Sequence, residues 1–265
     1  MYRSNAPYSS NLGTLVYGWG AIALGLVGFA WGDFASVWQP VPDSLPHRTA
    51  LAKIVALCLF SAGVAMQWPR LARLGVVVLS ILYFAAALLW LPRVIGFPRI
   101  YGTWAGFAEQ FSLVAAGIVA YSLSGSCNTS RTIRMAKVGC FLYGICVISY
   151  GLAHFFALSE TAGMVPAWLP PGQRFWAAAT GIAFLLAAIS ILSGVLASLA
   201  SRLLTAMIIV FGALVWAPAL FTYPHVHTVW AGNAINLALI GAAWVVADSI
   251  CQSSEVSESP QNSFA

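Results

Sequence analysis

The sequence predicts an all-α integral membrane protein with eight transmembrane helices, arranged as two parallel four-helix repeats. Three observations predict this class: an extreme apolar composition, uncharged stretches long enough to cross a bilayer, and an internal repeat. Of the 265 residues, 60% are hydrophobic and 7% are charged, whereas about a quarter of the residues in a soluble domain are charged. The mean hydropathy is +0.85. This composition excludes a soluble enzyme, a disordered chain and a secreted disulfide scaffold.

The charged residues are spaced widely enough for helical spans. A helix needs about 20 residues to cross a hydrocarbon core about 30 Å thick, and the period-two alternation of a membrane β-barrel is absent. In chain order, the uncharged stretches cover 4–32, 74–92, 110–130, 138–159, 175–201 and 203–247. The last stretch has room for two spans around a turn at Tyr223-Pro224, and one more span, which carries Lys53, lies between Arg48 and Arg70. The expected spans are therefore 14–35, 49–68, 72–91, 102–124, 136–157, 173–197, 202–221 and 228–250.

Lysine and arginine residues indicate the orientation. With eight spans, the face that holds both termini carries seven cations: Arg3, Arg70, Arg73, Arg131, Arg134, Lys137 and Arg202. The opposite face carries five: Arg48, Lys53, Arg93, Arg99 and Arg174. The positive-inside rule predicts a multi-pass protein of the cell inner (plasma) membrane with both termini in the cytoplasm. The net charge of +5 reflects these loops. Because no basic patch is interleaved with aromatic residues, the expected partner is the lipid bilayer and no nucleic acid.

One long segment of the chain recurs without a gap. LWLPRVIGFPRIYGTWAGFAEQFSLVAAGIVA (89–120) aligns with VWAPALFTYPHVHTVWAGNAINLALIGAAWVV (215–246), and VPDSLP (41–46) matches VPAWLP (165–170). The long segment repeats Trp90, Pro92, Pro98, Trp104, Ala105, Gly106 and Ala108 as Trp216, Pro218, Pro224, Trp230, Ala231, Gly232 and Ala234. The chain therefore divides into halves 1–125 and 126–265, the second ending in a short polar tail. Because four spans is an even number, the halves share one orientation, unlike the inverted repeats of many transporters.

Motifs of the second half point to a known family. GLAHF (151–155) is followed by VPAWLP, by Trp-Ala-Pro (216–218) and by Trp-Ala-Gly (230–232). Together, over about residues 145–248, these motifs resemble the DoxX-like (DoxX/DoxD) membrane proteins, a compact four-helix membrane fold. Relatives in that family include the quinone-linked subunit of thiosulfate:quinone oxidoreductase. The first half departs from the pattern, because Asp33 stands where the second half has His154.

The resemblance and the repeat place a candidate ligand site in the second half, on the non-cytoplasmic side beneath VPAWLP. His154 follows Tyr150 by one helical turn, so an imidazole and a phenol share a face and suit a quinone carbonyl. Tryptophans near the same interface can wall an apolar ring, although indoles at span ends are also ordinary membrane-interface residues. The candidate ligand-binding residues are Tyr150, His154, Trp168, Trp216, His225, His227 and Trp230.

Glu109 is a further candidate, because it lies about seven residues into the fourth expected span. Carboxylates within the bilayer are costly and usually face the bundle interior. Its expected partner is Lys53, a few residues into the second span from the same side. Ile235 and Ala177 replace these two charges in the second half, as expected for a pair that is lost together. A structural ion pair and a proton or ligand site remain alternatives.

The sequence specifies no cofactor outright. Quinone is the candidate that the resemblance implies. A metal could be bound by His154, His225 and His227, or a haem by two of them, but the spacing of these histidines matches no defined ligand motif. The five cysteines form no C-x-x-C pair, so dithiol exchange is not expected.

Three functions remain open, and with them the question whether the protein is an enzyme. The first is a redox-associated subunit that binds a quinone or another apolar ligand in the outer half of the bundle, together with a redox partner subunit. The second is a small-solute or proton-coupled carrier, suggested by the repeat and Glu109. The third is a non-catalytic membrane module that binds a partner. Fold resemblance alone does not choose among them.

Overall fold

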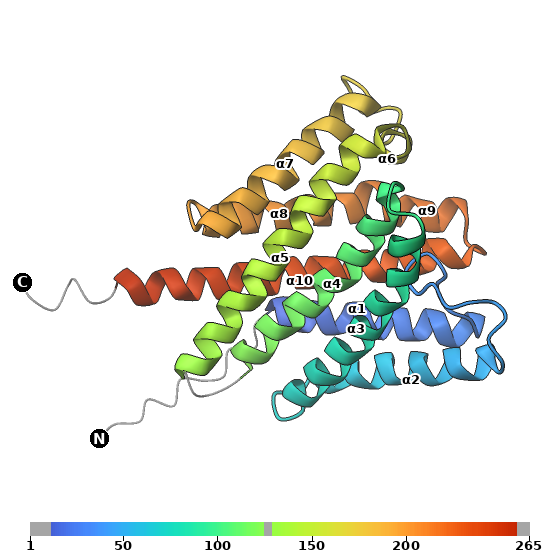
Figure 1. The fold of residues 1–265 in the computed structure, drawn as a ribbon, viewed down its shortest axis with the longest axis horizontal. Helices are drawn as coiled ribbons and strands as arrows, with labels where there is room; N and C mark the ends of the chain where they lie inside the picture. The colour runs from blue at the N-terminus through green and yellow to red at the C-terminus, as the bar shows by residue number, and fades with distance from the viewer. Residues whose placement is uncertain (1–11, 125–128, 259–265) are drawn as a thin grey trace, which may run out of the picture.

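The computed structural model describes residues 12–124 and 129–258, which form helices and connecting loops with no strand. The elements are α1 (Leu12–Trp31), α2 (Arg48–Met66), α3 (Ala72–Gly96), α4 (Tyr101–Leu123), α5 (Ser130–Phe156), α6 (Leu158–Met164), α7 (Gln173–Ser193), α8 (Ala197–Phe211), the π-helical turn η1 (Gly212–Trp216), α9 (Ala217–Thr222) and α10 (His227–Glu258) (Figure 1). Eight segments are long and apolar enough to cross a membrane, with α8, η1 and α9 forming one continuous span. The predicted all-α membrane class with eight spans is confirmed.

Several boundaries differ from the predicted ones for local reasons. α1 ends at Trp31 because Gly32 adopts a left-handed conformation, with φ 62°, and turns the chain. α5 begins at Ser130, where Thr129 and Thr132 form a reciprocal capping box that satisfies free backbone N–H groups. The short helix α6 lies where a loop was expected. α10 continues to Glu258, beyond the predicted start of the polar tail; the end of that tail, and Arg3, lie outside the described residues.

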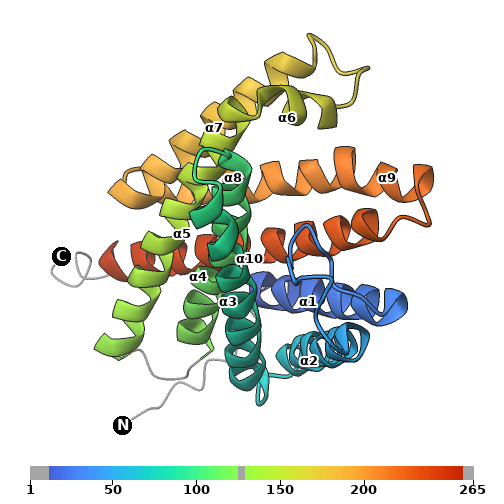
Figure 2. The ribbon, with the colours of Figure 1, turned by 45° about the vertical axis from the view of Figure 1, so that its right-hand side comes forward.

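The helices pack in a ring that follows the chain. α1, α2, α3 and α4 contact one another in sequence order, and α5, α7, α8 and α10 do the same. The two groups meet where α4 packs on α5, where α10 packs on α1, and where α4 contacts α10 (Figures 1 and 2). Each half therefore uses its first and last helices to hold the other half.

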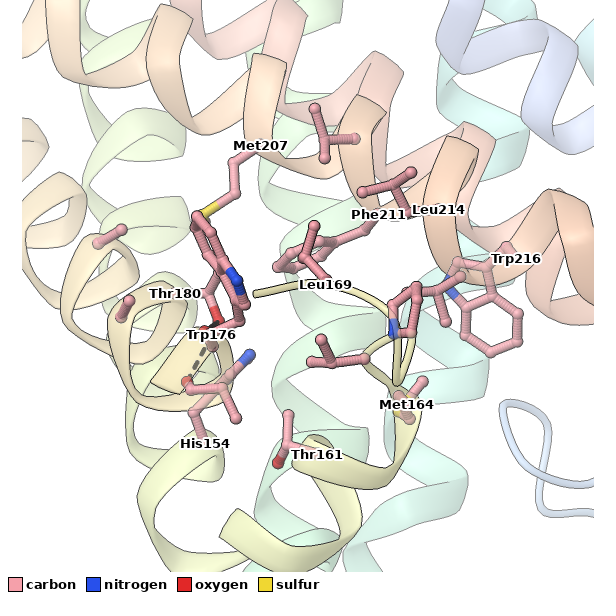
Figure 3. Close-up of a pocket in the computed structure, with 17 residues that line it drawn as sticks. His154, Thr161, Met164, Leu169, Trp176, Thr180, Met207, Phe211, Leu214 and Trp216 are labelled. Carbon is pink, nitrogen blue, oxygen red and sulfur yellow. Dashed lines mark hydrogen bonds between the residues drawn. The ribbon is translucent and has the colours of Figure 1, made fainter. Parts of the chain in front are cut away.

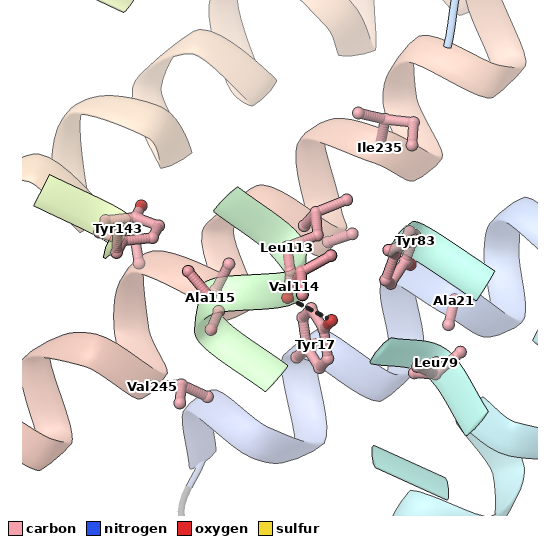
Figure 4. Close-up of a cluster of buried hydrophobic side chains, with 14 of the residues drawn as sticks. Tyr17, Ala21, Leu79, Tyr83, Leu113, Val114, Ala115, Tyr143, Ile235 and Val245 are labelled. Carbon is pink, nitrogen blue, oxygen red and sulfur yellow. Dashed lines mark hydrogen bonds between the residues drawn. The ribbon is translucent and has the colours of Figure 1, made fainter. Parts of the chain in front are cut away.

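Small residues permit the closest helix contacts. At the α1–α10 crossing, Gly20 lies against the backbone of Ala238, and Gly241 lies against the backbone of Tyr17. In the core, the Tyr17 hydroxyl donates to the Leu113 carbonyl of α4 at 2.8 Å (Figure 4). Small residues are enriched at transmembrane helix crossings because they let backbones approach and increase van der Waals contact.

The connections alternate between two faces. We call the face with the connections 32–47, 97–100, 157–172 and 223–226 the Pro-loop face. The opposite face, which we call the basic face, contains the α2–α3 and α7–α8 connections and carries Arg70, Arg73, Arg131, Arg134, Lys137 and Arg202.

The α1–α2 connection folds into the bundle at the Pro-loop face. Phe34, Ala35 and Trp38 are buried there, with 5%, 2% and 5% of their surface exposed. Arg48 closes the loop, because it pairs with Asp33 at 2.7 Å and donates to the Val41 carbonyl. Burial alone would raise the pKa of Asp33, but hydrogen bonds from the Arg48 side chain and the Phe34 backbone hold it below the ordinary value.

Candidate functional site

A cavity of about 550 Å³ lies between α5, α6, α7 and the α8–η1 segment (Figure 3). We call it the aromatic chamber. It lies beneath the VPAWLP loop, which contributes Val165, Pro166 and Leu169 to its wall. The other lining residues are His154, Thr161, Met164, Trp176, Ala177, Ala179, Thr180, Ala183, Met207, Val210, Phe211, Leu214, Val215 and Trp216. Ligand cavities of about 300–1,000 Å³ with mostly apolar walls are typical of small-molecule sites.

The π-helical turn η1 supplies one wall of the chamber. Proline has no N–H donor, and its ring collides with the carbonyl four residues earlier, here that of Leu214. The widened turn immediately before Pro218 accommodates that ring. Asn233 of α10 donates to the Trp216 carbonyl at 2.8 Å, which ties the end of this turn to α10. Leu214 and Trp216 line the chamber from this turn.

Most polar hydrogens in the chamber wall are already bound within the protein. The hydroxyls of Thr161 and Thr180 donate to the carbonyls of Ala157 and Trp176 in their own helices. The indole N–H of Trp176 donates to the Pro170 carbonyl at 2.9 Å. These groups therefore present little free donor capacity to the cavity.

His154 has one ring nitrogen committed and one free. Its Nδ1 lies 2.8 Å from the Tyr150 carbonyl. Since a carbonyl only accepts, Nδ1 must carry the proton of this hydrogen bond. Nε2 is then a lone-pair acceptor in the neutral ring, and it has no partner among the residues that the structure describes. The ring packs beside Phe184 and Phe211, with centroids 5.2 Å and 6.4 Å away.

Trp216 lies across the chamber from His154 (Figure 3). Within the described parts of the chain, its indole N–H has no hydrogen-bond partner, whereas the corresponding indole of Trp90 donates to the Trp38 carbonyl. The mostly apolar lining thus includes one ring nitrogen and one indole N–H that have no partner in the described chain.

Behind Trp216, a ring contact and a series of hydrogen bonds connect the chamber wall to Glu109. The indole of Trp38 meets that of Trp216 edge-on at 5.9 Å and donates its N–H to Glu109 Oε1 at 3.0 Å. Ser112 donates to the Glu109 carbonyl, and the Tyr150 hydroxyl donates to Ser112 Oγ at 2.5 Å. This series therefore ends one helical turn from His154.

The predicted ion pair between Lys53 and Glu109 is not formed in the described structure. Lys53 is exposed, and among the described residues the ion pairs join Arg48 to Asp33 and to Asp43. Glu109 is hydrogen-bonded by the indole of Trp38 instead. The difference arises because the α1–α2 connection folds inward, which places this indole beside the carboxylate.

The other predicted ligand-binding residues are only partly brought together. His154 and Trp216 line the chamber, whereas the Tyr150 hydroxyl is committed to Ser112. His227 and Trp230 pack on Trp31, with ring centroids 5.2 Å and 6.3 Å away. Trp168 is 71% exposed, and His225 is exposed in the 223–226 connection.

The histidines do not converge. Within 12–124 and 129–258, no three His, Cys, Asp or Glu side chains are grouped so as to hold a metal ion. The structure therefore offers no common site for His154, His225 and His227.

Sequence reasoning missed Trp176, Met207 and Phe211 as wall residues. One signal was available for Trp176, because it follows Pro170 by six residues. Trp104 and Trp230 follow Pro98 and Pro224 at the same spacing, and all three indoles donate to the carbonyl of that proline.

No model of a protein family matches the chain, and no curated protein sequence and no solved structure matches it.

Proposed function

We propose that the protein binds a lipophilic ring compound of the quinone class in the aromatic chamber, as a redox-associated membrane subunit. The observation that carries this proposal is an apolar cavity of about 550 Å³ with an unpartnered imidazole nitrogen in its wall. Aromatic and aliphatic walls suit a planar ring and its hydrocarbon tail, and a few placed polar atoms fix its orientation. The resemblance of the second half to DoxX-like proteins supports the same ligand class.

The two halves, 1–125 and 126–265, are proposed to be parallel repeats. In each half a tryptophan ring occupies the space beside a glycine, Trp90 on Gly106 and Trp216 on Gly232. The contacts between the halves are paired in the same way, since the fourth span of each packs on the first span of the other. A pseudo-two-fold axis along the membrane normal would generate this pattern.

The halves differ at the chamber, which supports a ligand site in the second half. In the first half, the connection after α1 inserts Trp38 next to Trp90 and Glu109. In the second half, the corresponding connection forms α6, and the match of VPDSLP to VPAWLP puts Ala162 at the position of Trp38. The indole that fills space in one half thus has no counterpart in the other.

Filling the chamber tests the proposed function. Ala183→Phe adds a ring to the α7 wall and should reduce the affinity for a short-chain ubiquinone analogue at least about tenfold. Binding is measured by native mass spectrometry and by titration in nanodiscs. The matched control is Ile182→Phe at the preceding position of α7, where the side chain is 51% exposed. Equal affinities for Ala183→Phe and Ile182→Phe would place quinone binding elsewhere or nowhere.

A proton-coupled carrier is the second candidate, and Glu109 favours it. The carboxylate lies within α4 with one side-chain donor, Trp38, at 3.0 Å. Intramembrane carboxylates commonly mark proton or substrate pathways. If Glu109 carries a proton across, then Glu109→Gln should abolish proton uptake by proteoliposomes that contain the protein. Uptake that persists in the variant removes this candidate.

The proposed orientation places the Pro-loop face outside the cytoplasm. Exposed positions on both faces allow a direct test: Ser44 and Ala167 on the Pro-loop face and Leu196 on the basic face. In a background with the native cysteines replaced by serine, an impermeant maleimide should label Ser44→Cys and Ala167→Cys in intact cells. Leu196→Cys should be labelled only after the membrane has been permeabilised. The reverse pattern would show that the protein is inverted.

A further inference from the structure

We infer that the aromatic chamber selects the reduced, hydroxyl-bearing form of its ring ligand over the oxidised carbonyl form. This inference rests on the proposed function, because it concerns the ligand of that site. It differs from the expectation that His154 and Tyr150 serve a quinone carbonyl, since the Tyr150 hydroxyl donates to Ser112. One polar atom decides it, His154 Nε2, because the Trp216 N–H can pair with an oxygen of either form.

The first step is the proton on His154. The Nδ1–H group donates to the Tyr150 carbonyl at 2.8 Å, in the same helix. This contact fixes the tautomer, because the other ring nitrogen of neutral histidine is then an acceptor. Nε2 therefore presents a lone pair in a mostly apolar wall, from a ring that packs beside Phe184 and Phe211.

The other polar groups near the chamber offer a ligand few hydrogen-bond donors. The hydroxyls of Thr161 and Thr180 have given their hydrogens to helix carbonyls, so their oxygens can still accept. Tyr150, which would be the natural donor to a carbonyl, gives its hydrogen to Ser112. Trp216 has the one indole N–H of the chamber wall without a partner in the described chain.

These atoms complement a quinol better than a quinone. A quinol hydroxyl can donate to His154 Nε2, and its other oxygen can accept from Trp216. A quinone offers acceptors alone, so a carbonyl oxygen opposite Nε2 leaves two lone pairs facing each other and the imidazole unpaired. The quinol gains a hydrogen bond at this nitrogen, whereas the quinone buries the nitrogen without a partner, which is the costlier state. A preference of at least about tenfold for the quinol follows.

Paired titrations test the inference. Decylubiquinol and decylubiquinone are titrated anaerobically into the full-length protein in nanodiscs, with the dimethyl ether of the quinol as a third ligand. The wild type should bind the quinol at least about tenfold more tightly than the quinone, and the ether should bind like the quinone. His154→Phe should lose this preference and bind both forms with similar affinity.

His154→Gln is the second variant, because its amide both donates and accepts and should bind quinol and quinone about equally. Thermal stability of both variants, measured alongside, separates loss of a contact from loss of the fold. Equal wild-type affinities for quinol and quinone, or a preference that survives in His154→Phe, overturn the inference while the proposed function stands. Absence of binding for both forms, with Ala183→Phe without effect, overturns the proposed function and the inference with it.

Discussion

Trp38→Ala is expected to lower the free energy of unfolding by about 3–5 kcal/mol, the cost typical of removing a large buried aromatic side chain. Trp38 is 5% exposed and contacts the edge of Trp216. Its indole donates to Glu109 at 3.0 Å. The alanine therefore opens a cavity and also leaves a carboxylate inside the bundle without its donor, which is costly in a low-dielectric environment. Denaturant or thermal unfolding in detergent measures the change.

Two further variants separate the causes. Trp38→Phe keeps most of the ring volume but removes the N–H that donates to Glu109. It should therefore lower the free energy of unfolding by about 1–3 kcal/mol, the cost of leaving the carboxylate without this donor. Trp168→Ala changes a tryptophan of the VPAWLP connection that is 71% exposed, and it should stay within about 0.5 kcal/mol of the wild type. A Trp38→Ala protein as stable as Trp168→Ala would show that the α1–α2 connection does not insert into the bundle.

The class and the spans were predictable because they depend on local quantities. Eight uncharged or nearly uncharged stretches of sufficient length determine eight helices in a bilayer, since backbone polar groups must pair within the segment. The observed ends agree to within a few residues at most boundaries. The differences were largest at α5, where a threonine capping box extends the helix from the expected residue 136 back to Ser130, and at α10, which continues past the expected residue 250 to Glu258.

The partner of Glu109 was not predictable in the same way. Helical periodicity indicates which face a residue occupies, and two charges near the same end of neighbouring spans make a reasonable pair. The partner that the structure provides comes from an irregular connection, where Trp38 has no periodic signal. Such a loop is fixed by tertiary contacts, including the ion pair of Asp33 with Arg48.

The chamber depends on the helix geometry before Pro218, which could not be predicted from the match between the two segments. Pro92 and Pro218 occupy corresponding positions, yet α3 continues through Pro92 as an α-helix to Gly96. Before Pro218 the helix widens into the turn η1. Gly212 begins that turn, and the space beside it is taken by the amide of Asn236. The first half has Ala86 at the position of Gly212, so a neighbouring polar side chain and a missing Cβ accompany the wider turn.

Gly241→Ala is expected to lower the free energy of unfolding by about 2–3 kcal/mol through the contact that joins the halves. A Cβ at position 241 would fall less than 3.0 Å from the backbone N and Cα of Tyr17, which cannot rotate away. α1 and α10 would have to separate, and the hydrogen bond from Tyr17 to Leu113 would be strained with them. The higher helix propensity of alanine, about 1 kcal/mol, offsets part of this cost.

The matched control is Gly102→Ala near the start of α4, where an added Cβ meets no atom within 4 Å. Because only the propensity changes there, this variant should be as stable as the wild type or more stable by up to about 1 kcal/mol. Thermal unfolding of the two variants in one detergent gives the comparison, and near-ultraviolet circular dichroism reports the packing of Tyr17. Since α10 holds α1 through backbone contact at Gly241, equal stability of the two variants would contradict the α1–α10 crossing and the ring of helices that depends on it.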